Sequence, residues 1–217
     1  MMLATPFLVG ITGGLGRGKS MVCYFLAEMG CALFESDRVA KELQLHDPQV
    51  IEGIKALFGT DVYSLNAAGS LVLDRKKIAS SVFSSSEKLD ALNGLIHPKV
   101  AGEFQKAVLN ARTQGKKILV KEAAILFESG GNEGLDAVVV VAADVEERIA
   151  RAVQKGMGRR EEIVARIAAQ WPLEKLMAKA DYVLFNRGTP EELKKETEAL
   201  YLVLLAAAES HFRHTQR

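Results

Sequence analysis

The segment that most constrains the fold of this chain lies between residues 13 and 20. It reads Gly-Gly-Leu-Gly-Arg-Gly-Lys-Ser and matches the pattern G-x-x-x-x-G-K-[ST] at every fixed position. Glycines let the backbone curl so that successive N–H groups point at the oxygens of one phosphate group. The helix that follows such a segment directs the positive end of its dipole at the same anion. The pattern therefore predicts a phosphate-binding loop between a strand and a helix.

The sequence has a strand pattern before this loop and a helix pattern after it, as a phosphate-binding loop requires. Residues 6–12 form a short apolar run typical of a buried strand, and residues 20–29 carry apolar side chains at helical spacing before Gly30. An ordinary glycine-rich turn can match the pattern by chance, but it has no reason to stand between a strand and a helix. In the phosphate-binding interpretation, Lys19 neutralises the β- and γ-phosphates of ATP and the Ser20 hydroxyl binds Mg²⁺.

The rest of the chain alternates between strand and helix patterns. Further strands are expected at residues 31–34, 118–121, 135–142 and 180–185. Helices are expected at residues 37–45, 48–58, 74–82, 86–95, 98–112, 144–155 and 161–170, with a short one from Pro172 and a terminal one from Pro190. Residues 59–72 read as an irregular loop. This alternation predicts a mostly parallel sheet with helices on both faces.

Length and composition narrow the class of protein. The 217 residues suit one α/β domain with an added lobe or lid, and 28 Lys and Arg against 27 Asp and Glu leave no basic excess for binding nucleic acid. No run approaches the roughly 18 apolar residues of a membrane span, and the first residues lack a signal-peptide pattern. Cys23 and Cys31 are too far apart for a C-x-x-C motif. We expect a cytoplasmic protein with no nucleic-acid or membrane partner, and the sequence leaves its oligomeric state open.

Two acidic residues follow expected strands. In an open parallel sheet the carboxyl ends of the strands face the ligand crevice. Asp37, just past the strand at residues 31–34, could there orient a hydroxyl nucleophile and accept its proton. Its position suits a helix N-cap equally well, as does that of Ser36. Glu122, at the end of the strand at residues 118–121, is a second inward candidate, with a plain charge at a strand exit as the alternative.

A basic cluster lies between residues 148 and 166. Arg148, Arg151 and Lys155 are spaced i, i+3, i+7 on one helical face. A solvated helix face is the ordinary reading of such spacing, but a phosphotransferase also needs mobile cations over the transferred phosphoryl group. The glycines around Met157 supply a hinge for such a lid. Asp144 is interpreted mainly as the N-cap of this helix.

Seven segments together resemble the dephospho-coenzyme A kinase family over nearly the whole chain. In chain order they are GGLGRGKS at 13–20, ESD at 35–37, LDR at 73–75, IHP at 96–98, EAAILFE at 122–128, RIAAQWP at 166–172 and ADYVLFN at 180–186. The phosphate loop is shared with many families, whereas the HP, LFE and ADYVxxN segments in this order are specific.

The resemblance implies a P-loop kinase with a three-layer αβα fold. It implies a core at residues 1–59, 116–149 and 173–217, a helical substrate-binding insertion at about 60–115 and a lid at about 150–172. The implied reaction is the ATP-dependent phosphorylation of the ribose 3′-hydroxyl of dephospho-CoA, the last step of coenzyme A synthesis. The other readings are a different small-molecule or nucleotide P-loop kinase, or a degenerate nucleotide-binding regulator.

The same resemblance assigns roles to individual residues. The catalytic set is Lys19, Asp37, Arg151 and Lys155. The ATP-binding set is Gly14, Leu15, Gly16, Arg17, Gly18, Lys19, Ser20 and Met21, with Asn186 and Gly188 near the adenine. The acceptor-binding set is Asp37, His97, Leu126, Phe127 and Glu128, and His97 could instead sit at a helix start. Ser20 is the expected Mg²⁺ ligand.

The chain departs from the family pattern at a few positions. Arg17 stands where the family has a small residue, so a long cation either crowds the phosphates or points to solvent. Met21 replaces a common Thr, and Ala124 replaces a proline, which predicts a looser turn in the acceptor segment. Lys155 aligns with a lid arginine and lacks the planar fork that grips two oxygens at once.

Overall fold

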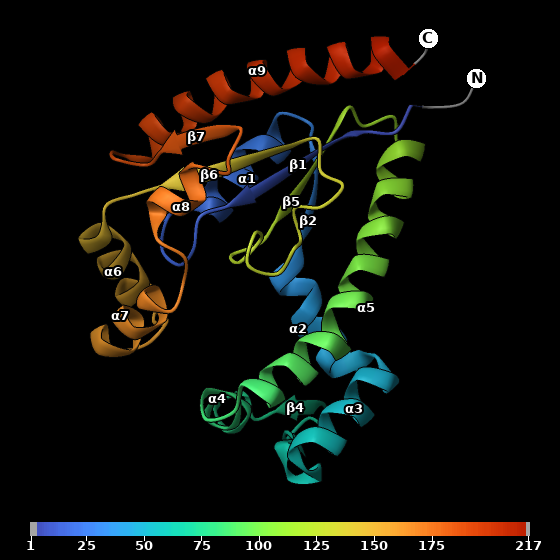
Figure 1. Ribbon diagram of the computed structural model, residues 1–217, viewed down its shortest axis with the longest axis vertical. Coiled ribbons are helices and arrows are strands. Elements are labelled where there is room, and N and C mark those ends of the chain that lie inside the picture. Colours follow the sequence, from blue (N-terminus) through green and yellow to red (C-terminus); the bar gives the residue numbers. More distant parts are fainter. Residues whose placement is uncertain (1–3, 216–217) are drawn as a thin grey trace. The chain divides into compact units, whose positions relative to one another are not determined.

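The computed structural model describes residues 4–215, and these form two compact units. Of the described residues, the first unit comprises 4–35 and 107–215, and the second comprises Ser36–Lys106. Within the described residues of the first unit, a five-stranded parallel sheet has the order β2-β5-β1-β6-β7. The predicted parallel sheet is therefore confirmed, with the strand that precedes the phosphate loop at its centre (Figure 1).

The elements of the first unit follow the predicted ranges to within about two residues. The strands are β1 (Phe7–Thr12), β2 (Ala32–Glu35), β5 (Ile118–Glu122), β6 (Ala137–Ala142) and β7 (Tyr182–Phe185). The helices are α1 (Lys19–Glu28), α6 (Val145–Gln154), α7 (Arg160–Ala168), α8 (Leu173–Met177) and α9 (Pro190–Thr215). Asp144 caps α6 as predicted, because its Oδ1 accepts a hydrogen bond from the Glu146 N–H at 2.9 Å.

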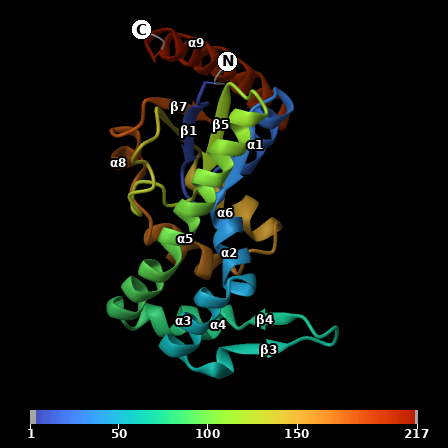
Figure 2. The same ribbon diagram turned by 90° about the vertical axis from the view of Figure 1, so that its right-hand side faces the viewer.

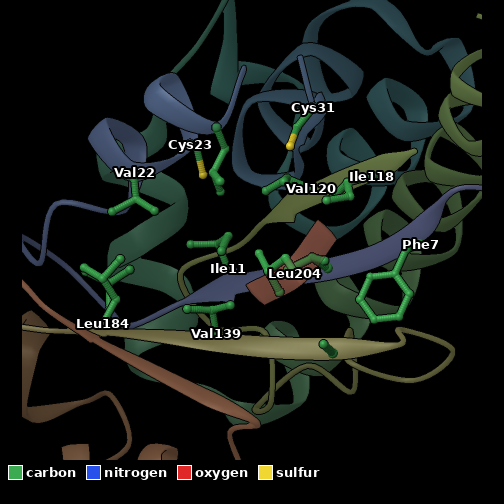
Figure 3. Packing of buried hydrophobic residues seen from close by; sticks show 14 of the residues in the cluster. Phe7, Ile11, Val22, Cys23, Cys31, Ile118, Val120, Val139, Leu184 and Leu204 are labelled. Carbon is green, nitrogen blue, oxygen red and sulfur yellow. The ribbon is translucent and has the colours of Figure 1, made fainter. Parts of the chain in front are cut away.

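One face of the sheet forms the main core against α1 and α9. Val9 of β1 and Leu26 of α1 belong to this buried cluster. Figure 3 shows Ile11 and Val139 of the central strands in the same cluster with Leu204 of α9. Cys23 and Cys31 are free thiols buried in the same cluster. On the other face, Val138 packs with Ala123 and Leu126, and α8 lies against β6. The central strands are thus buried on both sides, which explains their continuous apolar sequences.

The second unit has a core of its own. It contains α2 (Ser36–His46), α3 (Pro48–Phe58), the 3₁₀ turn η1 (Thr60–Val62), β3 (Tyr63–Leu65), β4 (Leu71–Leu73), α4 (Arg75–Phe83) and the start of α5 (Ser86–Thr113). Val50 and Ile54 of α3 pack against Leu73, Ile78 and Ile96. Because of this packing, α2 and α3 belong to the second unit, whereas the sequence placed them in the core at residues 1–59.

The prediction of an irregular loop at residues 59–72 is wrong. The chain there forms η1 and an antiparallel hairpin of β3 and β4 (Figure 2). The Asn66 side chain closes the turn by accepting hydrogen bonds from the N–H groups of Ala68 and Ser70. Each strand has three residues, which is too short for an alternating pattern to stand out in the sequence.

The two helices expected at residues 86–95 and 98–112 are one continuous helix, α5, with Pro98 inside it. A proline removes one hydrogen bond to the carbonyl four residues earlier and crowds that carbonyl. Here this residue is Gly94, which is exposed, so water can satisfy its carbonyl. Ile96 and Val100 pack into the same core on either side of Pro98, which favours continuing the helix over breaking it.

Among residues 4–215, no helix is long and apolar enough to cross a membrane.

Candidate active site

The phosphate loop connects the end of β1 to the start of α1. Gly13, Gly14, Gly16 and Gly18 all have positive φ, a conformation that other residues rarely adopt. Gly18 sits in the left-handed region at the N-cap of α1. A Cβ atom on Gly13 would collide with the Val141 carbonyl, and one on Gly18 would collide with the Asn186 amide. These positions therefore require glycine both for backbone conformation and for space.

Lys19 is held at the mouth of this loop. Its side chain is almost buried, and Nζ donates a hydrogen bond to the Gly14 carbonyl at 2.9 Å. Glu122, at the carboxyl end of β5, places Oε1 3.7 Å from the same Nζ. Glu122 therefore points toward the phosphate loop, as its strand-end position suggested. A cation held in place before phosphate arrives does not have to be ordered at the moment of binding.

Ser20 and Glu122 present oxygen atoms side by side. The exposed Ser20 hydroxyl lies 3.5 Å from Glu122 Oε1. Hydroxyl and carboxylate oxygens are ligands that Mg²⁺ accepts, usually together with waters and substrate phosphates. Within residues 4–215 there is no group of three or more His, Cys, Asp or Glu side chains suited to hold a metal ion alone. The residues present therefore fit a Mg²⁺ ion that arrives with a nucleotide.

Of the two orientations considered for Arg17 from the sequence, the structure excludes the one toward solvent. Its side chain is 3% exposed, so it does not point to solvent, and in the described part of the chain its Nε and Nη1 have no hydrogen-bond partner. Burial, with a smaller effect of nearby Arg148, lowers the pKa of Arg17 to about 10. The group thus remains a buried cation at neutral pH.

Asn186, expected near the adenine, contacts the phosphate loop. Its Nδ2 donates to the Arg17 carbonyl at 2.9 Å, and its backbone N–H donates to the Ala142 carbonyl at 2.7 Å. The residue is buried and ties the end of β7 to the loop. Its contact with adenine stays a prediction, as does that of the exposed Gly188.

The expected lid includes parts of α6 and α7, called the lid helices below, and the basic residues of α6 differ in their surroundings. Arg148 is buried, and its Nε donates to the Leu15 carbonyl at 2.9 Å. Arg151 is partly buried and pairs with Glu147 at 2.8 Å, while Lys155 is exposed at the end of α6. The helical spacing placed all three on one face but did not reveal that Arg148 binds the loop.

Gln170 is a contact residue that sequence reasoning missed. It follows α7, and its Oε1 accepts a hydrogen bond from the Leu15 N–H at 2.9 Å. A glutamine in a loop carries no periodic or charge signal that would mark it. Its position inside the RIAAQWP segment was the available hint.

The segment that follows β5 combines core and accessible residues. Leu126 is fully buried with Ala123 and Val138, so its side chain serves the core, and contact with an acceptor would require this segment to open. Phe127 is partly buried beside it. Glu128 Oε1 accepts from the Trp171 N–H at 3.4 Å, and the buried Oε2 has no partner in the region described.

Asp37 and His97 lie in the second unit. Asp37 is exposed in the first turn of α2, which already begins at Ser36, and the buried Ser36 hydroxyl has no hydrogen-bond partner among the described residues. Neither residue therefore acts as the N-cap considered from the sequence. His97 is exposed in the interior of α5, so it is not at a helix start.

A family model described as dephospho-CoA kinase matches residues 7–192. The chain belongs to the dephospho-CoA kinase family. It is 64% identical over 203 residues to the dephospho-CoA kinase of Chlorobium chlorochromatii, covering 94% of this chain and 96% of that one. It is 40% identical over 199 residues to the dephospho-CoA kinase of Leptospira interrogans, covering 92% and 93%.

Solved structures agree with the fold. The crystal structure of TT1252 from Thermus thermophilus has a TM-score of 0.77 at 31% identity, covering 93% of this chain and 99% of that chain. The dephospho-CoA kinase from Campylobacter jejuni has a TM-score of 0.67 at 22% identity, covering 93% and 98%, and supports the fold alone. The expected P-loop kinase fold is confirmed.

Three departures from the family pattern, besides Arg17, can be placed in the structure. Ala124 stands where the family pattern has proline, yet the turn keeps its hydrogen bonds: Ser129 N–H to the Ile125 carbonyl at 3.1 Å and Gly131 N–H to the Leu126 carbonyl at 2.8 Å. The Lys155 ammonium, in place of an arginine, lies in solvent at the end of α6. Met21, the third departure, is exposed on α1.

Proposed function

We propose that this chain transfers the γ-phosphate of ATP to the ribose 3′-hydroxyl of dephospho-CoA and so produces coenzyme A. The observation that carries the proposal is the placement of Lys19 and Glu122 at the mouth of the phosphate loop in a chain of this family. A nucleoside triphosphate requires a cation near its phosphates, and its metal ion requires oxygen ligands such as those of Ser20 and the neighbouring carboxylate.

The loop residues bind and orient the nucleotide. The backbone N–H groups of Gly14 and of residues 16–20 cradle the phosphates, whereas the Leu15 N–H is bonded to Gln170. Lys19 neutralises the charge on the β- and γ-phosphates. Ser20, with Glu122 through water, would hold Mg²⁺, which when bound neutralises phosphate charge. Arg151 and Lys155 add positive charge from the lid helices. Arg151 exchanges its surface partner Glu147 for phosphate oxygens.

Asp37 acts on the acceptor. The acceptor oxygen forms a bond to the γ-phosphorus as the bond from phosphorus to the β,γ-bridging oxygen breaks, and ADP leaves. Asp37 orients the hydroxyl and takes its proton late in the transfer. Its exposed position on α2 leaves the carboxylate accessible to a substrate. His97, Phe127 and Glu128 complete the proposed acceptor contacts.

The function is tested by turnover on purified protein. ATP is supplied with dephospho-CoA, and with adenosine or AMP as alternative acceptors, each with and without Mg²⁺. We expect Mg²⁺-dependent conversion of dephospho-CoA to coenzyme A and little ADP formation with the other acceptors. Preferred phosphorylation of adenosine or AMP would favour a different small-molecule kinase. Nucleotide binding without turnover on any acceptor would favour a regulator.

The state of the two cysteines bears on the cellular compartment in which the reaction takes place. Cys23 and Cys31 are both free. Free cysteines suit a reducing compartment, and we infer a cytoplasmic location.

A further inference from the structure

Both backbone groups of Leu15, at the tip of the phosphate loop, are bonded to the lid segment. The Leu15 N–H donates to Gln170 Oε1 at 2.9 Å, and the Leu15 carbonyl accepts from Arg148 Nε at 2.9 Å. Arg148 Nη2 also lies 3.5 Å from the same Gln170 oxygen. Leu15, Arg148 and Gln170 thus contact one another, and Leu15 is bonded both to α6 and to the segment that follows α7.

The Leu15 side chain joins the same assembly. It packs against a small cluster of Ile149 and Ala152 from α6 and Ile163 from α7, with Ile167 beside it. This cluster is separate from the main core between the sheet, α1 and α9. The apolar interior of the lid helices therefore includes the tip of the phosphate loop.

The neighbouring glycines show how close this approach is. A Cβ atom on Gly14 would lie 2.5 Å from Gln170 Oε1, and one on Gly16 would lie 2.5 Å from the Arg148 carbonyl. Nothing larger than glycine fits on either side of Leu15 while these contacts are kept. Two of the loop glycines thus serve contact with the lid segment as well as curvature of the loop.

Arg148 occupies this place at an energetic cost. It is 4% exposed, burial lowers its pKa, and the buried Arg17 cation lies close enough for the two positive charges to repel each other. A buried cation is tolerated only where it makes hydrogen bonds that offset the lost hydration. For Arg148 these are the bonds to Leu15 and Gln170.

We propose that Gln170 and Arg148 are positioning residues that clasp Leu15, so that the shape of the phosphate loop and the placement of the lid helices change together. The inference rests on the proposed function, because it assigns the loop to nucleotide phosphates. Arg151 lies three residues after Arg148 on the same helix. A nucleotide that fixes residues 14–18 thereby fixes the helix that carries the phosphate-facing cations.

The experiment compares nucleotide binding with the response of the lid segment. Trp171, the only tryptophan of the chain, directly follows Gln170 and reports on this segment by its fluorescence. ADP with Mg²⁺ is titrated into the wild type and into Gln170→Leu, with affinity from calorimetry and lid response from Trp171 emission. Turnover of ATP and dephospho-CoA is measured in parallel.

We expect ADP to bind Gln170→Leu within about threefold of the wild-type affinity, because the variant loses the hydrogen bond from the Leu15 N–H and a long contact with Arg148, whose net effects are small. The Trp171 response to ADP should be lost. The kcat should fall about 10- to 100-fold, because the cations on α6 are no longer held in place. KM for dephospho-CoA should stay unchanged.

The matched control is Gln154→Leu, the same change at an exposed lid position. It should keep both the Trp171 response and kcat. Arg148→Met should reproduce the loss, whereas Arg148→Lys, which can still donate to the Leu15 carbonyl, should recover part of the response. If Gln170→Leu destabilises the fold in a thermal melt, this Arg148 pair carries the same test.

A normal Trp171 response and normal kcat in Gln170→Leu and Arg148→Met would overturn the clasp. Equal losses in Gln154→Leu would also overturn it, since any lid change would then suffice. The ADP measurements need no acceptor, so failure of wild-type protein to phosphorylate dephospho-CoA would count against the proposed function and leave the clasp intact.

Discussion

The phosphate loop and the lid helices hold their cations in opposite ways. Lys19 of the loop is 8% exposed and already bonded to the Gly14 carbonyl, whereas Lys155 of the lid lies in solvent and Arg151 rests on a surface carboxylate, Glu147. The Arg151–Glu147 pair is an i,i+4 pair with both side chains partly in solvent, and such pairs contribute little, about 0–1 kcal/mol, so Arg151 can exchange partners at small cost. The loop is thus organised before a nucleotide arrives, whereas the proposed function requires the nucleotide to draw in the cations of α6.

The largest effect expected from this contrast is that of Lys19→Ala. Removing the prearranged cation should lower kcat by about 10³-fold, in the range seen when one preorganised charge-stabilising group is lost. The thermal unfolding midpoint should stay close to wild type, because Glu122 gains access to water. Steady-state kinetics and a thermal melt measure both, with the exposed Lys195→Ala as the control. An active variant would remove the basis for treating the loop as the phosphate site.

Asp37→Asn should have the next largest effect. The amide keeps the shape of the side chain but cannot accept a proton, so kcat should fall about 10²-fold, the lower end for a lost general base. ATP affinity should be unchanged, because Asp37 lies on α2 and has no place in the phosphate loop. Kinetics combined with calorimetric ATP binding separates the two quantities. Equal losses in both would contradict the role given to Asp37.

Arg17→Met tests the energetic cost of organising the loop. The wild-type side chain buries two guanidinium nitrogens that have no partner in the described region, beside a second cation. An unsatisfied buried donor costs about 1–3 kcal/mol, so the free energy of unfolding should rise by roughly this amount in the variant. Urea denaturation measures it, with the exposed Arg75→Met expected to change little. A destabilised Arg17→Met would mean that the guanidinium has a partner that matters to the fold.

The smallest effect concerns the lid. Lys155→Arg restores a planar fork that can grip two phosphate oxygens, and we expect ATP affinity to rise by a few-fold, about 1 kcal/mol or less, because the site is exposed. The fold should be unaffected. Calorimetric titration with ATP measures the change. If ATP affinity rose by a factor as large as the fall in kcat expected for Lys19→Ala, the view that the lid cations are only loosely held would be contradicted.

Sequence reasoning succeeded where local pattern determines structure. The loop glycines, the apolar central strands and the N-cap at Asp144 each follow from short-range chemistry, and the structure has all of them. It failed where tertiary packing decides. Pro98 lies inside a helix because apolar neighbours on both sides pack into one core, and three-residue strands close a hairpin that no period could show.

The candidate site shows the same division. Glu122 was expected to face the ligand crevice, because the carboxyl ends of parallel strands lie at one edge of a sheet, and it lies there beside Lys19. Gln170 could not be predicted, since a side-chain amide that accepts one backbone N–H has no sequence signature. Nor could the burial of Arg17, because whether a long cation turns inward depends on the space left by α6 and α8.

The two buried cysteines turn the folded enzyme into a convenient background for chemical labelling. Burial raises the pKa of the Cys23 thiol well above its usual value and that of Cys31 to about 11. The reactive species is the thiolate, so both groups should be slow toward maleimides while the chain is folded. A cysteine introduced at an exposed position such as Gln154 would then be the fast-reacting thiol, and its rate of modification would time the exposure of the lid without prior removal of the native thiols.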